Sequence, residues 1–327
     1  MSNMKDRWLA KSNGLKVTWF DNWHAVLDEA LDSLPEMEAC PHDLFRRLVQ
    51  THGAAQKRAA LVTEHGSPVA IVGLRKIGRY RHELVTWVIV PDSVFPAQSG
   101  YLIPALEALG VETIVGWRRM DSAPPPSPLM RNRETIPVHQ MQCSADFEEY
   151  WRTSVSGHWN TIKKCRKRCQ DFVFAVNTPG AAEWTIQNWG KTWNMEPVLL
   201  EDSLMIARYL ENRGRHYTFL LLDQGKPVAG HTFVPHRNDF VWQQTYRDPA
   251  YDSHGVGTRL MDLTFHWAAE AGFETIDLGG RHEYKSRWAP PDGELWIFTI
   301  CPEPLFRAKQ AFDWARTARR ELMNRVR

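Results

Sequence analysis

The alternation of apolar and polar positions occurs twice along the chain in the same order. Residues 61–74, LVTEHGSPVAIVGL, and residues 220–233, LLLDQGKPVAGHTF, each place a Gly-x-Pro-Val-Ala turn between two apolar runs. Further on, EALGVETIVGW at 107–117 parallels EAGFETIDLGG at 270–280. The two pairs of segments are separated by nearly the same stretch of chain. The sequence therefore predicts a duplicated structural unit.

Each predicted unit consists of a β-hairpin, a third strand, a helix and a closing strand. The third strand is expected at 82–90 in the first unit and at 239–247 in the second. The helix is expected near 100–109 and 255–271. Strands interrupted by a helix predict an α/β fold, with a mixed (α+β) sheet and helices on its faces.

The proline-rich stretch APPPSP at 123–128 separates the two units, because proline continues neither a helix nor a central strand. We therefore expect a first unit at 1–128 and a second unit at 129–327. The second unit opens with a polar segment, 145–171, that predicts a helix interrupted near Gly157.

Two segments of the second unit are basic. The run KKCRKR at 163–168 predicts a strongly positive helix. The C-terminal segment, 303–327, is rich in arginine and predicts an amphipathic helix whose apolar face contains Leu305, Ala308 and Phe312. A basic helix either binds an anionic partner or is simply solvated, and the sequence leaves both interpretations open.

The overall composition is that of an ordinary globular protein, with 43% hydrophobic residues and a net charge of +2. The N-terminus lacks the apolar core of a signal peptide, and no stretch approaches the roughly 18 apolar residues of a membrane span. The five cysteines fit no disulfide framework, so we expect a cytoplasmic protein. Cys165 and Cys169 have no CxxC pair or paired histidines beside them, so we expect no metal site.

The stretch DSHGVGTRL, residues 252–260, lies between a predicted strand and a predicted helix. A helix start exposes unpaired N–H groups, and glycine lets an anion approach them closely. The equivalent stretch of the first unit, PDSVFPAQSGYL at 91–102, has no Gly-x-Gly, which favours a ligand in the second unit over a tight turn required by the fold. The stretch is neither a Walker A loop nor a dinucleotide fingerprint. We expect phosphate to be bound here by His254, Gly255, Val256, Gly257, Thr258 and Arg259.

The second half of the chain resembles the GNAT acyltransferase superfamily, whose cofactor motif is Gln/Arg-x-x-Gly-x-Gly/Ala at a helix start. Gly255 and Gly257 match the two small positions, whereas Asp252 stands where Gln or Arg is expected. Residues 246–289 further resemble the CelD/BcsL-type (BioF2-like) proteins, which are tandem GNAT proteins related to the Fem peptidyltransferases. The most specific piece is Asp277-Leu278-Gly279-Gly280 followed by Glu283-Tyr284-Lys285 and Trp288.

This resemblance spans roughly residues 15–300 and implies two tandem GNAT-like units, of which the first is degenerate and the second binds the cofactor. It implies an acyl-CoA-dependent N- or O-acyltransferase (EC 2.3.1 type), with acetyl-CoA or another acyl-CoA as co-substrate. The thioester would enter a gap where the strands near 240–247 and 273–278 separate. A strand N–H would stabilise the oxyanion, and an amine or hydroxyl of a small molecule or sugar precursor would attack without a metal or a covalent acyl-enzyme.

The resemblance implies roles for two neighbouring residues. Tyr284 lies where superfamily members often place a tyrosine, so its hydroxyl is expected to protonate the leaving thiolate. Packing of the ring on the sheet is the alternative. Lys285 is expected to bind a CoA phosphate, and a solvated lysine is the alternative.

The general base is harder to assign. His231 in the middle of a strand is a candidate base or a core histidine, with Asp277 and Glu283 as weaker candidates. Gln243 and Gln244 lie on opposite faces of a regular strand, so one of them points into the cleft. We assign Gln244 to the cleft as a substrate-orienting residue.

Two other functions stay open. A Fem-like aminoacyltransferase would bind tRNA through the basic helix at 163–168 and would show strongly salt-dependent binding. A non-catalytic GNAT-fold binding module is consistent with the departure at Asp252. On the acceptor side we expect His82, Trp87 and Trp117 of the first unit. The sequence determines neither the acceptor nor the oligomeric state.

Overall fold

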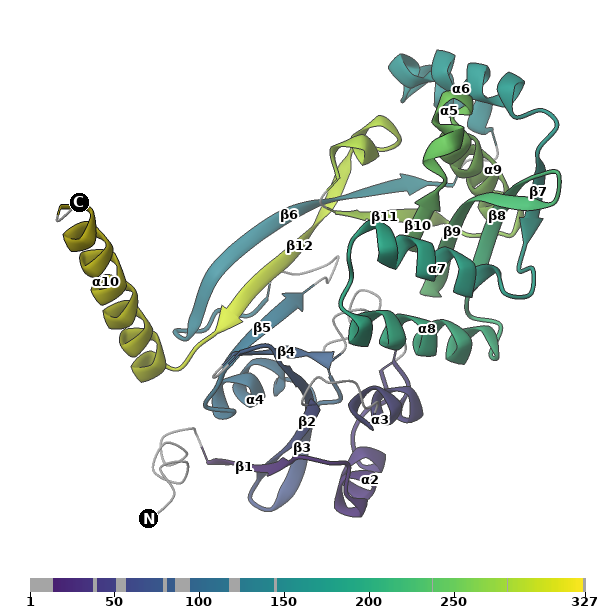
Figure 1. Cartoon of the computed structure of the whole chain (residues 1–327). Coiled ribbons are helices and arrows are strands. Elements are labelled where there is room, and N and C mark those ends of the chain that lie inside the picture. The colour runs from purple at the N-terminus through teal and green to yellow at the C-terminus, as the bar shows by residue number, and fades with distance from the viewer. Residues whose placement is uncertain are drawn as a thin grey trace.

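The computed structural model describes residues 14–37, 40–50, 57–78, 81–85, 95–117, 124–143, 146–236, 238–280 and 282–325. Their strands form one mixed sheet of twelve strands in the order β1-β2-β3-β4-β5-β12-β6-β11-β10-β9-β8-β7. Helices lie on both faces of this sheet (Figure 1). The predicted α/β fold with a mixed sheet is therefore confirmed.

The first unit, which we define as β1 to β5 with their helices, contains the expected hairpin and a parallel strand pair. Strands β2 and β3 form the hairpin, and β4 pairs in parallel with β5. Its elements are β1 (Leu15–Phe20), α2 (Ala25–Asp32), α3 (His42–Gln50), β2 (Lys57–Glu64), β3 (Ser67–Lys76), β4 (Arg81–Leu84), α4 (Leu102–Ala108) and β5 (Glu112–Trp117).

The second unit, β7 to β11 with their helices, has the same order. Strands β8 and β9 form the hairpin, and β10 pairs in parallel with β11. Its elements are α5 (Phe147–Thr153), α6 (Ser156–Arg168), β7 (Val173–Val176), α7 (Ala181–Thr192), α8 (Pro197–Glu211), β8 (Tyr217–Asp223), β9 (Lys226–His236), β10 (Asp239–Arg247), the 3₁₀ helix η3 (Pro249–His254), α9 (Val256–Glu270), β11 (Thr275–Gly280) and the 3₁₀ helix η4 (Glu283–Arg287). The predicted duplication is confirmed.

The two units exchange strands. Strand β6 (Met130–Gln142) follows the first unit in the chain but pairs with β11 of the second, and β12 (Pro291–Ile300) follows the second unit but pairs with β5 of the first. The two long strands also pair with each other in the middle of the sheet (Figure 1). Each unit therefore completes the sheet of the other.

Helices α7 and α9 pack on opposite faces of the second unit. Gly230 of β9 faces α7 so closely that a Cβ there would lie 2.2 Å from Thr185 Oγ1. The adjacent strand position, His231, and Phe233 face the other way, toward the core that includes Leu260 and Phe265 of α9. The helix predicted at 145–171 is divided at Ser154 and Val155, slightly before the expected break.

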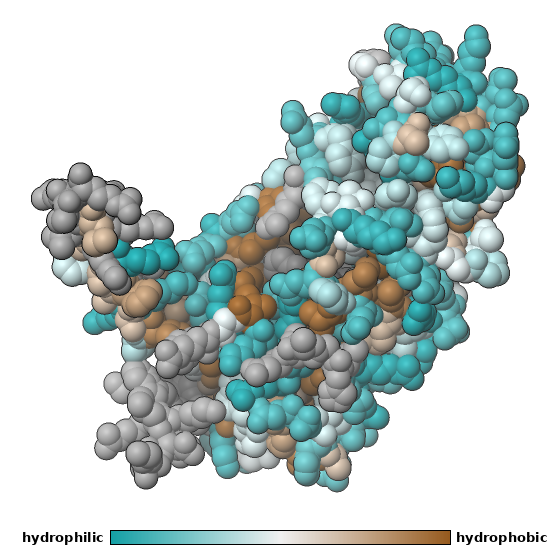
Figure 2. Space-filling view, viewed as in Figure 1, coloured by the Kyte–Doolittle hydropathy of each residue, from teal (hydrophilic) through white to brown (hydrophobic). Residues whose placement is uncertain are grey.

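Helix α10 (Glu303–Arg325) projects from the body after β12 (Figure 1). Its first turn is attached by an ion pair between Arg131 and Glu303. Figure 2 shows apolar atoms on this projecting helix, where Phe312, Trp314 and Met323 are exposed. Among the described residues, no helix is both long enough and apolar enough to cross a bilayer.

Candidate active site

Strands β10 and β11 separate after three residue pairs. Asp239, Phe240 and Val241 pair with Thr275, Ile276 and Asp277, and the parallel pairing then ends. Beyond this point β11 stays with β6, through Gly279 opposite His139, while β10 stays with β9. Gly279 turns the strand with a φ of +73°, and its N–H donates a hydrogen bond of 2.7 Å to Asp277 Oδ1. The two strands are therefore unpaired beyond Val241 and Asp277, where the sequence predicts that the thioester enters, and we call this point the gap.

A β-bulge in β10 lies beside this gap. The register with β9 shifts by one residue between Trp242 and Thr245, so the regular alternation of faces is interrupted. Trp242 stays on the α9 face beside Phe233, whereas the N–H of Gln244 donates to Thr232 Oγ1 on the α7 face at 3.0 Å. The Gln244 side chain accepts a second hydrogen bond from the same hydroxyl. The bulge therefore places Gln244 on the α7 face, where it is bonded to Thr232, and its role in orienting substrate stays a prediction.

The start of α9, which we call the α9 mouth (residues 255–258), adjoins the gap. Its first amides, those of Val256, Gly257 and Thr258, precede any intrahelical acceptor and point out of the helix. Gly255 has a left-handed φ of +74°, and a Cβ on it would lie 2.3 Å from Cys165 Sγ. A Cβ on Gly257 would meet only Arg247 Cδ, at 3.3 Å. The fold thus requires Gly255 itself, whereas Gly257 leaves the mouth uncovered.

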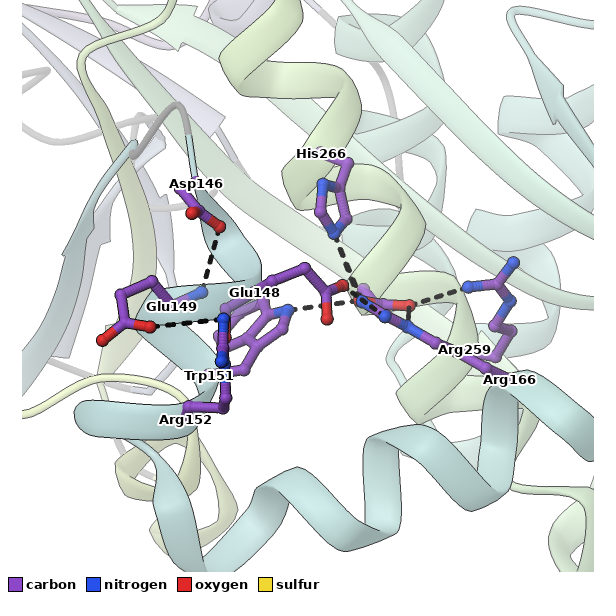
Figure 3. Close-up of polar contacts among 9 residues, drawn as sticks. Asp146, Glu148, Glu149, Trp151, Arg152, Arg166, Arg259 and His266 are labelled. Carbon is purple, nitrogen blue, oxygen red and sulfur yellow. Dashed lines mark hydrogen bonds and ion pairs between the residues drawn. The ribbon is translucent and has the colours of Figure 1, made fainter.

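Arg259 does not face the α9 mouth. Its Nη1 donates to Asp262 Oδ2 at 2.7 Å, one turn further along α9. Asp262 is fully buried and also receives hydrogen bonds from Arg166 and Trp151, and His266 lies at 3.6 Å (Figure 3). Burial alone would raise the pKa of Asp262, but its hydrogen bonds with Arg166 and His266 hold that pKa well below its usual range. The assignment of Arg259 to phosphate is therefore corrected: it neutralises a buried carboxylate.

Helix α6 forms the wall behind the α9 mouth. Arg168 Nη1 donates to the Ser253 carbonyl at 2.8 Å, and the Cys169 thiol lies 3.5 Å from the His254 carbonyl. Two of the five basic residues of the predicted run, Arg166 and Arg168, therefore make hydrogen bonds within the protein. The exposed charged residues of this helix are Lys163, Lys164, Lys167 and Arg168.

Tyr284 lies on η4 at the edge of the gap. Its ring is 6.2 Å from that of Trp242 on β10 and 5.7 Å from that of His282. Burial raises the pKa of Tyr284 to about 12, although the positive charge of Arg247 opposes this rise. The phenol is therefore protonated at neutral pH, as a proton donor must be.

Lys285 is turned inward instead of toward solvent. Its Nζ donates to the Gly280 carbonyl at 3.0 Å and lies 5.5 Å from the Trp242 ring centre. The side chain is buried at the closed end of the gap. The ammonium therefore has a partner within the protein, and the binding of a CoA phosphate by Lys285 stays a prediction.

The His231 side chain lies on the α9 face of β9 against Trp242, with 5.0 Å between the ring centres. Complete burial lowers the pKa of His231 to about 3. A neutral imidazole with so low a pKa is a poor proton acceptor, so we do not assign it as the base. Asp277 is buried and accepts the Gly279 N–H, and Glu283 is exposed.

Two residues near the gap were not predicted from the sequence. The first is Arg247 at the end of β10, whose guanidinium forms an ion pair with Asp252 beside the α9 mouth. The second is Trp193, which follows α7 and whose ring lies 5.4 Å from that of His282. An arginine at a strand end and a tryptophan after a helix carry no local motif, so only the fold brings them to the gap.

Of the residues expected on the acceptor side, His82 is the one whose side chain the structure describes, and its ring contact is with the first unit. His82 is buried on β4 of the first unit, with its ring 6.4 Å from Trp19. Trp87 and the side chain of Trp117 lie outside the described residues. In the part of the chain that the structure describes, no group of three or more His, Cys, Asp or Glu side chains is placed to hold a metal ion.

Comparison with known proteins supports the fold. Residues 156–286 match the family model described as an acetyltransferase (GNAT) domain. No curated protein sequence matches the chain significantly. The structure of L-PGS from Bacillus licheniformis is similar over 86% of this chain and 93% of that one, with 13% identity and a TM-score of 0.51.

Two further solved structures resemble the chain more distantly. A tandem GNAT protein from the clavulanic acid biosynthesis pathway covers 87% of this chain and 97% of its own, at 13% identity and a TM-score of 0.45. FemX covers 89% of this chain and 99% of its own, at 10% identity and a TM-score of 0.44.

The fold and the family match together indicate a GNAT-like fold for the second unit. Residues 156–286 form a GNAT domain, and the first unit repeats its strand order beside it. The two units therefore share one strand order, and the second contains the region that matches the GNAT domain model.

Proposed function

We propose that the chain is an acyl-CoA-dependent N- or O-acyltransferase that transfers an acetyl group in the cytoplasm. One observation carries this proposal: β10 leaves β11 after Val241, its last residue Arg247 reaches the α9 mouth at Gly257, and the protonated Tyr284 lies beside Trp242 of the same strand. A donor with a phosphate-bearing end and a thioester end fits these neighbouring features. The five cysteines are all free, which agrees with a reducing compartment.

Each group of residues at the gap has a separate role in the acyl transfer. The amides of Val256, Gly257 and Thr258 bind phosphate oxygens, because they carry the positive end of the helix dipole. A strand N–H at the β10 bulge stabilises the oxygen of the thioester carbonyl while the acceptor nitrogen or oxygen attacks the carbon. As the C–S bond breaks, Tyr284 gives its proton to the sulfur. It then takes the proton that the acceptor loses, which restores the phenol.

The acceptor approaches from the α7 side. Trp193 is 55% exposed, although its ring contacts His282 next to Tyr284 along the chain. An ion pair of 2.8 Å between Glu196 and Arg75 of the first unit holds this segment in place. An exposed indole beside the proton donor suits an amine or sugar-precursor acceptor with an apolar ring face.

Calorimetry with acetyl-CoA tests the donor site. Gly257→Glu places a carboxylate at the second position of α9, where it repels phosphate, so we expect binding to fall below detection. Gly157→Glu is the matched control, because Gly157 holds the same position at the start of α6 and a Cβ there has open space. Equal binding by the parent and Gly257→Glu, or no binding by the parent, contradicts the proposal.

A second candidate is an aminoacyltransferase that uses aminoacyl-tRNA. The exposed Lys163, Lys164 and Lys167 on α6 favour it, because they present a positive face to solvent. This candidate predicts RNA that copurifies with the protein and a binding constant that falls steeply with salt. A non-catalytic binding module predicts instead that acetyl-CoA binds without release of free thiol.

A further inference from the structure

Arg247 and Asp252 meet at the α9 mouth because the chain reverses between them. Arg247 ends β10, and Asp248 then begins η3, where its Oδ1 accepts the Ala250 N–H at 3.0 Å. This turn brings Asp252 back against the Arg247 guanidinium as an ion pair. The Arg247 side chain passes the α9 mouth, since its Cδ lies 3.3 Å from where a Cβ of Gly257 would be.

The guanidinium is available to a ligand despite this ion pair. The Arg247 side chain is 58% exposed and that of Asp252 is 49% exposed. An arginine has five N–H donors, and one carboxylate engages at most two of them well. A pair this exposed contributes little to stability, so its clearest effect is to orient the guanidinium.

Other cations near the α9 mouth are committed to protein oxygens. Arg259 is bound to Asp262, Arg168 to the Ser253 carbonyl and Lys285 to the Gly280 carbonyl. Arg247 differs, because its partner is an exposed carboxylate at the mouth itself. The position that carries a Gln or Arg in the motif is here Asp252, which cannot donate to phosphate.

We propose that Arg247 binds the pyrophosphate of the donor at the α9 mouth, oriented by Asp252, in place of the donor side chain that position 252 lacks. This inference rests on the proposed acyl-CoA function and deepens it, since it makes the site selective for a donor that carries a pyrophosphate. Arg247 also lies close enough to Tyr284 for its charge to favour the phenolate. Bound phosphate compensates that charge and keeps the proton donor protonated.

Calorimetry with two probes, coenzyme A and pantetheine, separates the phosphate contact from the rest of the site. Arg247→Ala is expected to weaken coenzyme A binding about 10- to 100-fold, the effect of losing charged hydrogen bonds, and to leave pantetheine binding unchanged. The double variant Arg247→Ala, Asp252→Arg restores a cation at the motif position and is expected to recover most of the coenzyme A affinity. Arg208→Ala is the control, because it removes an equally exposed arginine paired with Glu183.

The possible outcomes test the role of Arg247 separately from the proposed function. Equal coenzyme A binding by the parent and Arg247→Ala overturns the role of Arg247 and leaves the donor site standing. Weakening of both probes by Arg247→Ala also overturns it, because a phosphate contact cannot affect pantetheine. Failure of the parent to bind coenzyme A refutes the proposed function itself.

Discussion

Gly255 and Cys165 are packed so closely that a Cβ on the glycine would lie 2.3 Å from the cysteine Sγ. The glycine also has a φ of +74°, which L side chains rarely adopt. One glycine of the Gly-x-Gly pair is thus explained by the junction of α6 with the α9 mouth, and the other is not.

Gly255→Ala is therefore expected to destabilise the fold. The left-handed backbone costs about 1–2 kcal/mol for a residue with a Cβ, and the overlap with Cys165 adds about 1–3 kcal/mol. Cys165→Ala in the same chain should remove the second part and leave the first. Gly257→Ala is the matched control and should change the free energy of unfolding little, because that position is helical and faces a movable arginine. Urea denaturation of the parent and these three variants measures the differences; full stability of Gly255→Ala contradicts the packing.

Tyr284→Phe tests the proton donor. Loss of the phenol should lower kcat by about 100-fold, as is usual for general acids, while calorimetric binding of acetyl-CoA is unchanged. Because burial raises the pKa of Tyr284 to about 12, the parent should keep its kcat through pH 10, where an ordinary tyrosine is half ionised. Release of free thiol with an amino-sugar acceptor follows both effects. A parent whose kcat halves near pH 10, or a fully active Tyr284→Phe, argues against this role.

The repeated hydrophobic pattern was sufficient to predict the fold. The turns at Gly66 and Gly225 predicted the hairpins, and the helix expected at 255–271 corresponds to α9. The exchange of β6 and β12 was not predicted, because pairing between distant strands leaves no local periodicity.

The site was predicted less well, for reasons that differ between residues. The position of Gln244 on the α7 face was not predicted, because a one-residue bulge inverts the faces of β10, and the alternation of a regular strand cannot reveal it. The pairing of Arg259 could have been predicted, because Asp262 follows it at the i,i+3 spacing of helical ion pairs. Arg247 and Trp193 had no such signal, because the turn at η3 and the end of α7 alone bring them to the gap.

His231 makes the stability of the protein depend on pH. Its pKa is about 3 in the folded chain and about 6.5 when exposed, so the unfolded state binds the extra proton between these values. Stability should therefore fall as the pH drops below 6.5, by about 2 kcal/mol at pH 5 from this residue. His231→Leu should lose that part of the pH dependence in urea denaturation at several pH values. His65→Asn, at an exposed position with φ of +49°, should keep it. An unchanged acid dependence in His231→Leu contradicts the assignment.

Lys57 of β2 and Asp202 of α8 join the two units through a buried ion pair. Both side chains are 3% exposed, and Lys57 Nζ lies 2.7 Å from one carboxylate oxygen and 2.8 Å from the Leu48 carbonyl. Asp202→Asn leaves the lysine buried without its counter-ion, so we expect a loss of about 3–5 kcal/mol in the free energy of unfolding. The double variant Lys57→Met, Asp202→Leu removes both charges and should recover most of that loss, since apolar residues need no desolvation. Denaturation of Lys57→Met, Asp202→Leu and their double variant gives the coupling energy. Additive losses would show that the two charges do not interact and that the attachment of the units depends on other contacts.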